Sequence, residues 1–159
     1  MKKCGELLFN SEKDNWSENT SIFDSKIVGK GDIVIIVEDE ENNKFGYYTP
    51  KKISRVGEYS NDFNSFLFSL KSNGRIPRMM KFESLKSDKG FYVYSNTNVW
   101  LFGISNGFWI CKENMKMKSI CRENFSDNSF DLHNQKYPLI GKPGKSEFIP
   151  KRITVIQMQ

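Results

Sequence analysis

The sequence has no long apolar run and no leader-like start. Its longest aliphatic stretch, Ile33–Val37, has the length of one strand, whereas a membrane span needs about 20 apolar residues. The first residues, MKKCGELLFN, lack the apolar segment of a signal peptide. We therefore expect no membrane insertion and a cytoplasmic or nuclear location.

Residues that build disulfides and metal sites are also scarce. The cysteines are Cys4, Cys111 and Cys121, and the only histidine is His133. An odd number of widely spaced cysteines argues against a disulfide framework and predicts free thiols. These residues lack the spacing of zinc ligands, and the acidic run Asp39–Glu41 lacks the spacing of a calcium loop. We predict that the protein holds no metal.

No recognisable catalytic arrangement is present. Cys111 lies in an apolar segment and is expected in the core, whereas His133 lies in a polar segment and is expected in an exposed loop. No serine stands in a Gly-x-Ser-x-Gly elbow. Gly141–Lys145 lacks the Gly-Lys-Ser/Thr ending of a phosphate loop and a helix after it, and Gly29–Gly31 precedes a strand instead of following one. Both segments are therefore expected to be turns. We predict a protein that is not an enzyme and binds no cofactor.

Aromatic residues, in contrast, are abundant. They make up 14% of the 159 residues, which is enough to fill the core of one domain spanning 1–159. Apolar segments bounded by turn residues predict strands over residues 6–10, 32–38, 44–49, 63–70, 90–95, 99–104, 108–111 and 153–158. One short helix is expected over 21–28, with Ser21 as its cap and Gly29 after its end. Many short strands with little helix predict antiparallel sheets.

The side-chain pattern of three strands gives more specific expectations. Ile33–Val37 is apolar on both faces, which predicts a fully buried central strand. Phe66 and Phe68 share one face of their strand and are expected to point inward, with Leu67 on the opposite face. The final strand is expected to complete a sheet, so its deletion should unfold the domain.

Charge is unevenly distributed along the chain. Residues 1–70 carry a net charge of −3, whereas residues 71–159 carry +8. A basic half of this kind could attract nucleic acid, anionic lipid or an acidic protein, or it could be a solvated lysine-rich surface. Lys142, Lys145, Lys151 and Arg152 lie close together in sequence around the last strand, and they are the candidate nucleic-acid contacts.

Four aromatic residues also have two interpretations. Tyr92, Tyr94, Trp100 and Trp109 could be platforms on which bases stack. The sequence has no helix-turn-helix, zinc-finger or aromatic RNA-binding signature. Because aromatic residues in alternating strands more often face a core, we expect these four to be core residues.

Several apolar segments follow one another in a distinctive order. They are Asp32–Glu38, Phe45–Tyr48, Ser65–Leu70, Leu101–Ile104, Phe108–Ile110, Ser119–Cys121 and Arg152–Ile156. In this order they resemble the TLDc domain, which is found in oxidation-resistance proteins. The resemblance covers nearly the whole chain and suggests a divergent, stand-alone member of the family.

The resemblance implies a fold and a function. The implied fold is α+β, with two antiparallel β-sheets packed as a sandwich and flanked by short helices. The implied function is that of a non-catalytic binding module in the oxidative stress response, whose protein partners are subunits of the vacuolar proton pump. The alternative function is a DNA-binding transcriptional regulator that uses the basic C-terminal surface.

Overall fold

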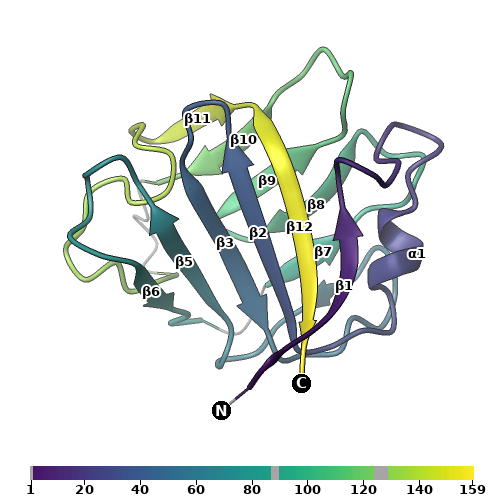
Figure 1. Ribbon diagram of the computed structural model, residues 1–159, viewed down its shortest axis with the longest axis horizontal. Coiled ribbons are helices and arrows are strands. Elements are labelled where there is room, and N and C mark those ends of the chain that lie inside the picture. The colour runs from purple at the N-terminus through teal and green to yellow at the C-terminus, as the bar shows by residue number, and fades with distance from the viewer. Residues whose placement is uncertain (1, 87–89, 124–128) are drawn as a thin grey trace.

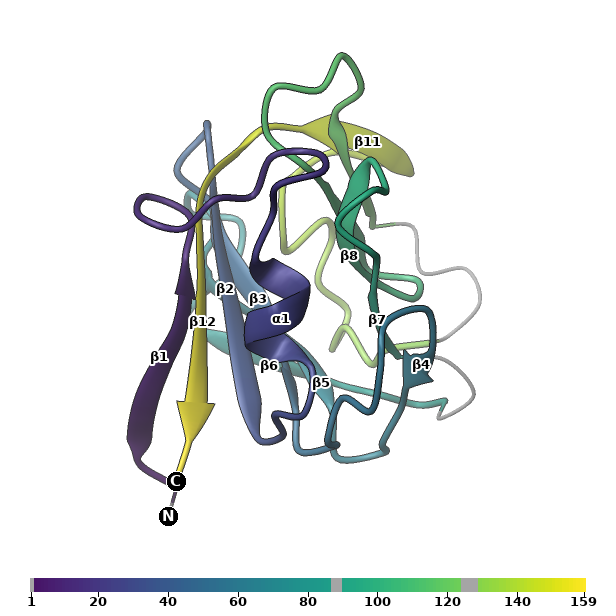
Figure 2. The ribbon, with the colours of Figure 1, turned by 90° about the vertical axis from the view of Figure 1, so that its right-hand side faces the viewer.

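The structure, a computed structural model, describes residues 2–86, 90–123 and 129–159. Its strands form two six-stranded antiparallel sheets, which lie as two layers (Figures 1 and 2). The first sheet consists, in spatial order, of β1 (Cys4–Asn10), β12 (Pro150–Met158), β2 (Ile33–Asp39), β3 (Lys44–Thr49), β5 (Phe66–Lys71) and β6 (Met80–Glu83). The second consists of β11 (Lys145–Phe148), β10 (Ser119–Arg122), β9 (Phe108–Cys111), β8 (Trp100–Ile104), β7 (Phe91–Val93) and β4 (Tyr59–Ser60).

The core lies between the two sheets and is rich in aromatic rings. Phe45 of β3 contacts Phe108 of β9 and Phe148 of β11, with ring centroids 5.1 and 5.6 Å apart. Phe102 of β8 stacks on Phe23 at 5.1 Å. All five rings are almost completely buried. The abundance of phenylalanine in the sequence thus supplies a core that both sheets share.

One short helix accompanies the sheets in the part of the chain that the structure describes. Helix α1 spans Phe23–Ile27, within the predicted range, and buries both of its terminal residues. The prediction of Ser21 as the cap is wrong, because Ile22 occupies the N-cap position and makes no side-chain cap hydrogen bond. The Ser21 hydroxyl still accepts a hydrogen bond from the Phe23 N–H at 3.2 Å. The protein is therefore mostly β, and the expected flanking by several short helices is not confirmed. No helix of the described residues is long and apolar enough to cross a membrane.

Two hairpins form where turn residues predicted them. Strands β2 and β3 are joined by a turn in which the Asp39 carboxylate accepts hydrogen bonds from the Asn43 backbone and side chain, both at 2.8 Å. Strands β8 and β9 are joined through Asn106, whose φ of 57° is in the left-handed region that asparagine tolerates. Local turn chemistry therefore fixes both pairings.

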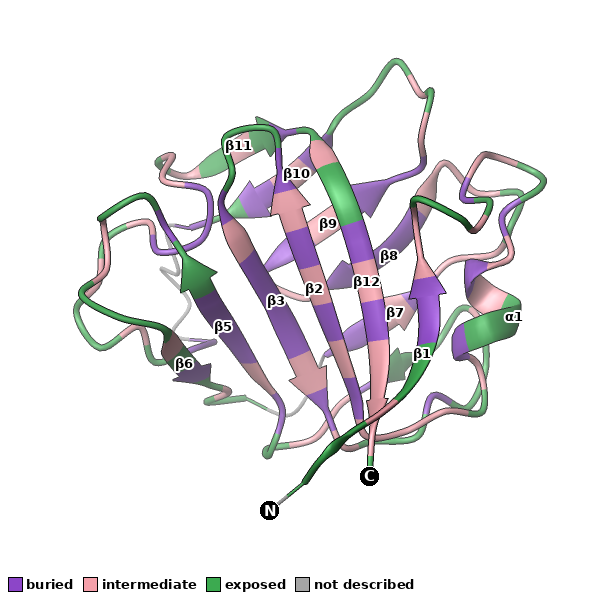
Figure 3. Cartoon of the chain, viewed as in Figure 1, coloured by how far each residue is buried: buried purple, intermediate pink, exposed green. Residues whose placement is uncertain are grey.

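Strand β2 is buried on one face only. Ile33, Ile35 and Val37 are fully buried between the sheets, whereas Val34 and Ile36 on the other face are partly exposed (Figure 3). The expectation of a fully buried strand is therefore wrong. Both faces are apolar, but no second layer among the described residues covers the outer one.

The faces of strand β5 are the reverse of the prediction. Leu67 is fully buried and pairs with the core residue Tyr47 of β3. Phe66 and Phe68 lie on the outer face of the sheet instead. Phe68 is nevertheless only 8% exposed, because its ring lies against Gly46. A Cβ atom at position 46 would be only 2.5 Å from that ring. Pairing with β3, rather than side-chain size, decides which face is buried.

Strand β12 lies inside the first sheet, between β1 and β2, rather than at an edge (Figure 1). Ile153 and Val155 enter the core, as the alternation of β12 predicts.

The chain segment before β11 is held by Glu123, a buried residue. The Glu123 carboxylate accepts hydrogen bonds from the backbone N–H groups of residues 139–142. Burial raises the pKa of Glu123, and these four donors act in the opposite direction.

The three cysteines are free thiols with different accessibility. Cys4 is exposed, whereas Cys111 and Cys121 are buried. Burial raises the pKa of Cys111 and raises the pKa of Cys121 well above its ordinary value. Cys111 donates its backbone N–H to Ser119, whereas Cys121 pairs with Phe108, so the two thiols are not directly opposite each other.

Thiol labelling should reflect this burial. We expect Cys4 to react rapidly in the folded protein, and Cys111 and Cys121 to react only as the domain opens, because the reactive thiolate is both hidden and disfavoured. In denaturant without a reducing agent, all three thiols should react. Mass spectrometry of labelled protein checks both statements, and a single reactive thiol in denaturant would reveal a disulfide.

Candidate functional site

The outer face of the second sheet carries a cluster of aromatic and basic side chains, which we call the aromatic–basic face. Its members come from strands β4, β7, β8, β9, β10 and β11 and from the residue that follows β7. They are partly or fully exposed. The members are Tyr59, Tyr92, Tyr94, Trp100, Trp109, Ile120, Arg122 and Lys145.

The tyrosines of this face form a ladder of neighbouring rings. The centroids of Tyr59 and Tyr92 are 4.9 Å apart, and those of Tyr92 and Tyr94 are 4.6 Å apart. Burial raises the pKa of Tyr94, and the hydroxyls of Tyr59 and Tyr92 act in the same direction. Tyr94 therefore stays neutral at physiological pH and can donate a hydrogen bond.

A basic edge adjoins the aromatic rings. The Arg122 guanidinium lies 5.3 Å from the centre of the Trp109 ring, within the range of a cation–π contact. Arg122 and Lys145 are opposite each other in the pairing of β10 with β11. Together with Tyr94, Trp100, Trp109 and Ile120, they line a hollow of about 170 Å³.

Strand alternation turns these aromatic residues outward. Phe91, Val93 and Phe102 are buried in the core, and Tyr92, between the first two, points the other way. Gly103 makes room for Trp109 on the neighbouring strand, because a Cβ atom at position 103 would lie 2.3 Å from the indole ring.

The expectation that the four aromatic residues of the sequence analysis are core residues is therefore wrong. Phenylalanine and aliphatic residues occupy the inward positions of these strands. Tyrosine and tryptophan, each with a polar group, occupy the half-exposed outward positions, as residues with one polar end often do.

The structure places the four predicted nucleic-acid contacts in different surroundings. Lys145 belongs to the aromatic–basic face. Lys142 forms an ion pair with Glu41 at 3.1 Å, and Arg152 forms one with Glu12 at 2.8 Å. Lys151 is exposed on β12, in the other sheet. The fold does not bring the four together, and their contact with DNA stays a prediction.

Arg122 is a member of this surface that is not among the predicted contact residues. Ser119 and Cys121 are buried, and Arg122, one position further along the same strand, is exposed. The alternation in β10 signals that Arg122 points outward. Nothing in the local sequence signals that its neighbour is Lys145, because the pairing of β10 with β11 brings them together.

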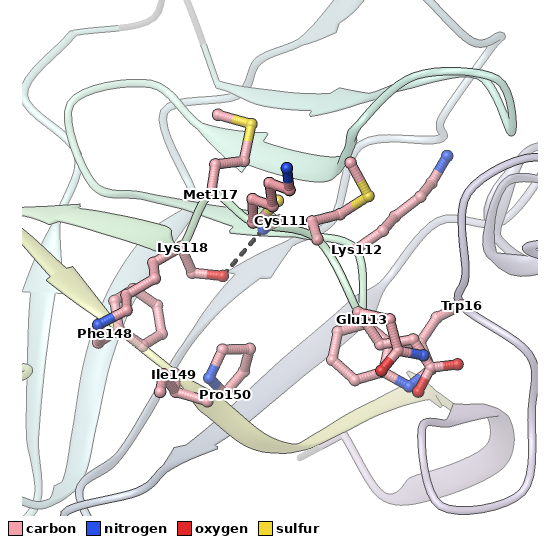
Figure 4. Close-up of a pocket in the computed structure, with 13 residues that line it drawn as sticks. Trp16, Cys111, Lys112, Glu113, Met117, Lys118, Phe148, Ile149 and Pro150 are labelled. Atoms are coloured by element: carbon pink, nitrogen blue, oxygen red, sulfur yellow. Dashed lines mark hydrogen bonds between the residues drawn. The ribbon is translucent and has the colours of Figure 1, made fainter.

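A second hollow, of about 290 Å³, lies beside the 112–118 loop (Figure 4). Met117 lies on one side of it, and Phe148 and Pro150 lie across from the loop. Two charged residues of its lining are already engaged: the Lys112 ammonium donates to the backbone carbonyls of residues 95, 96 and 98, and Glu113 accepts from the Ser17 hydroxyl at 2.7 Å.

Cys111 lines the same hollow, but its surroundings do not activate it. Its backbone N–H donates to the Ser119 hydroxyl at 2.9 Å. Its thiol donates to the Val99 carbonyl at 3.4 Å, and burial raises its pKa. A cysteine nucleophile needs the opposite environment, one that favours the thiolate.

A third surface, which we call the apolar face, is the outer side of the first sheet. Cross-strand pairing aligns Ile156, Val34, Tyr48 and Phe66 in one row. Ile36 and Phe68 belong to the next row, on either side of Gly46. A hollow of about 420 Å³ lies over this face, lined by Val34, Ile36, Tyr48, Phe66, Phe68, Leu70, Met79, Met80 and Lys81.

His133 and the acidic residues do not form a metal centre in the described segments. His133 is exposed, as expected, and its Nε2 lies 3.1 Å from Glu83. No group of three or more His, Cys, Asp or Glu side chains within residues 2–86, 90–123 and 129–159 is arranged to hold a metal ion.

Comparison with known families identifies the chain. The family model of the TLDc domain matches residues 2–153, nearly the whole sequence. The chain belongs to the TLDc domain family. The resemblance inferred from the order of its apolar segments is thereby confirmed. TLDc domains are associated with resistance to oxidative stress. A search of the curated proteins finds no match to this TLDc domain.

Proposed function

We propose that this TLDc domain is a non-catalytic binding module of the oxidative stress response that recognises a protein partner through the apolar face. The observation that supports this most is the row formed by Ile156, Val34, Tyr48 and Phe66, which crosses four strands on the outer side of the first sheet. Contiguous apolar surface of this kind is typical of interaction sites.

The apolar face resembles the centre of a protein interface in composition. Its hollow combines aromatic rings with aliphatic and methionine side chains. Leu70 and Met79 are 37% and 69% exposed. Aromatic residues and methionine are enriched in interfaces, and methionine adapts its shape to a partner. A partner with an apolar stripe would remove these side chains from water.

The charge around the apolar face supports the proposal of a partner with acidic residues. Lys81 lies with its ammonium 4.4 Å from the centre of the Phe66 ring and forms an ion pair with Glu83 at 3.5 Å. Lys71 and Arg78 are exposed, and neither forms an ion pair with another described residue. A basic border beside an apolar centre fits an amphipathic helix that has acidic residues along the flanks of its apolar stripe. We propose that such a helix belongs to a subunit of the vacuolar proton pump.

Charge reversal at this border provides the test. In the double variant Lys71→Glu and Lys81→Glu, we expect affinity for the purified proton pump to fall at least about tenfold, because like charges would then face each other. The matched control is Lys51→Glu with Lys52→Glu, which makes the same change in net charge on the loop that follows β3. Surface-immobilised pump and soluble TLDc domain are sufficient for the measurement.

Two results would contradict this proposal. The first is an unmodified domain that does not bind the pump at all. The second is an equal loss of affinity in the test and control variants, which would show that the effect is one of net charge and not of the apolar face.

DNA binding is the second candidate function. The net charge of +8 in residues 71–159 supports it, as does the position of Lys145 opposite Arg122. A transcriptional regulator would use Lys142, Lys145, Lys151 and Arg152 on phosphates, although ion pairs with Glu41 and Glu12 already engage two of the four.

A further inference from the structure

We propose that the aromatic–basic face binds single-stranded nucleic acid, with bases stacked on its aromatic rings and phosphates held by Arg122 and Lys145. This site lies on the second sheet and does not depend on the protein partner proposed for the first. It also differs from a duplex site built on the C-terminal cations, because its ligand must offer unpaired bases.

The aromatic rings are arranged as a stacking platform. The tyrosine ladder of positions 59, 92 and 94 has centroid separations of 4.9 and 4.6 Å, and Trp109 lies on the adjoining part of the same face. These rings are partly exposed, with Tyr59 at 49%. Stacking of a base on such a ring contributes about 1–3 kcal/mol and tolerates any base, since every base has a π-face.

The strands that carry the platform are anchored in the core. Tyr92 and Trp109 stand on paired strands whose inward residues, such as Phe91 and Ile110, are fully buried. Gly103 lets the indole of Trp109 lie against the sheet. Because core packing fixes the strands that carry these rings, we expect little conformational entropy to be lost when a base stacks on them.

The charges of the face favour an anionic ligand. Arg122 is held over Trp109, and Lys145 lies opposite it; neither forms an ion pair with the rest of the described chain. Glu147, opposite Ile120 in β11, is the acidic neighbour. Two cations against one carboxylate leave a net positive edge beside the rings. Alternating phosphate and base is the chemistry that matches this pattern.

The size and shape of the hollow select a single strand. A volume of about 170 Å³ is well below the ~300–1,000 Å³ of usual ligand pockets, and it suits one flat ring system. The bases of a duplex are stacked on one another, so they cannot also stack on Tyr92 or Trp109. A duplex could contact only the two cations, and its affinity should therefore be lower.

A fluorescence titration with single strands of about 12 nucleotides, one of DNA and one of RNA, tests the proposal. We expect quenching of tryptophan fluorescence at low salt. Tyr59→Ala should weaken binding by about fivefold or more, as expected for loss of one stacked base. Arg122→Gln with Lys145→Gln should flatten the plot of log affinity against log salt by about 1.4, because each phosphate contact on a single strand contributes about 0.7.

Matched controls separate a specific site from net charge. Lys142→Gln with Arg152→Gln removes the same two charges elsewhere, and it should change the salt slope less than the pair in the aromatic–basic face. Lys71→Glu with Lys81→Glu changes the apolar face instead. If this variant loses affinity for the protein partner and keeps its affinity for the single strand, the two sites are separate. Melting temperatures of all variants confirm that each is folded.

Three outcomes would overturn the proposal. One is the absence of binding to either single strand at about 100 μM protein and low salt. The affinity would then be weaker than that of ordinary non-specific binding. Another is a duplex of equal length bound as tightly as the single strand. The third is affinity that is unchanged by Tyr59→Ala while both charge-removing pairs weaken it equally, which would mean that phosphate attraction alone accounts for binding.

Discussion

Deletion of residues 150–159, which removes strand β12, should leave a chain that does not fold. β12 lies between β1 and β2, and β1 has no other strand partner among the described residues. The deletion therefore removes Ile153 and Val155 from the core and also releases Leu8 and Phe9 of β1. Burial of these four side chains contributes about 6–12 kcal/mol, comparable with the whole stability of about 5–15 kcal/mol of a typical domain.

Circular dichroism and amide NMR dispersion are suitable measurements for this deletion. The truncated chain should lose its β spectrum and show no cooperative thermal transition. A chain that lacks only Gln159 is the control, because it loses the backbone hydrogen bonds with Lys3 and keeps the core intact. If the longer deletion still unfolds cooperatively, β12 is not integral to the first sheet.

Strands and hairpins could be predicted from the sequence where local chemistry decides them. Lys44–Thr49 and Phe108–Cys111 were predicted with their observed bounds. Each pairs with a neighbour in the chain, and each follows a turn with a left-handed asparagine, Asn42 or Asn106. Such turns fix register without any help from distant parts of the chain.

The burial of each strand face could not be predicted in the same way. Strand β5 alternates Phe66, Phe68 and Leu70 with Leu67 and Ser69, so the larger side chains favoured an inward position for the first set. The actual choice depends on Tyr47, which pairs with Leu67 and is itself in the core. When both faces of a strand are apolar, hydrophobic periodicity does not say which face the second sheet covers.

The candidate site shows the same division between local and distant information. Lys142 and Lys145 were grouped with Lys151 and Arg152 because they lie close in sequence, yet the last two belong to a strand of the other sheet. Arg122 lies far from Lys145 in sequence and opposite it in the fold. A surface built from six strands depends on their pairing, which single-residue patterns do not contain.

The second large effect is expected at the centre of the core, where Phe102→Ala should destabilise the domain by about 3–5 kcal/mol. Phe102 is fully buried, and its ring centroid lies 5.1 Å from Phe23, 5.6 Å from Phe91 and 6.2 Å from Phe108. Alanine would remove all three ring contacts and leave a cavity between α1 and the second sheet. In a domain of this size, the melting temperature should fall by about 6–20 °C.

The same substitution at an exposed phenylalanine tests whether the loss of stability comes from the buried position of Phe102 or from the loss of any phenylalanine. Phe63 is 65% exposed, so Phe63→Ala should change the free energy of unfolding by no more than about 0.5 kcal/mol. Phe102→Leu should recover part of the loss, because leucine refills much of the cavity without restoring ring contacts. Urea unfolding of the three variants gives the comparison, and equal losses at positions 63 and 102 would be incompatible with a core centred on Phe102. The loss in free energy of unfolding should follow the cavity volume that each substitution leaves in the core. It should be largest for Phe102→Ala, smaller for Phe102→Leu and smallest for Phe63→Ala.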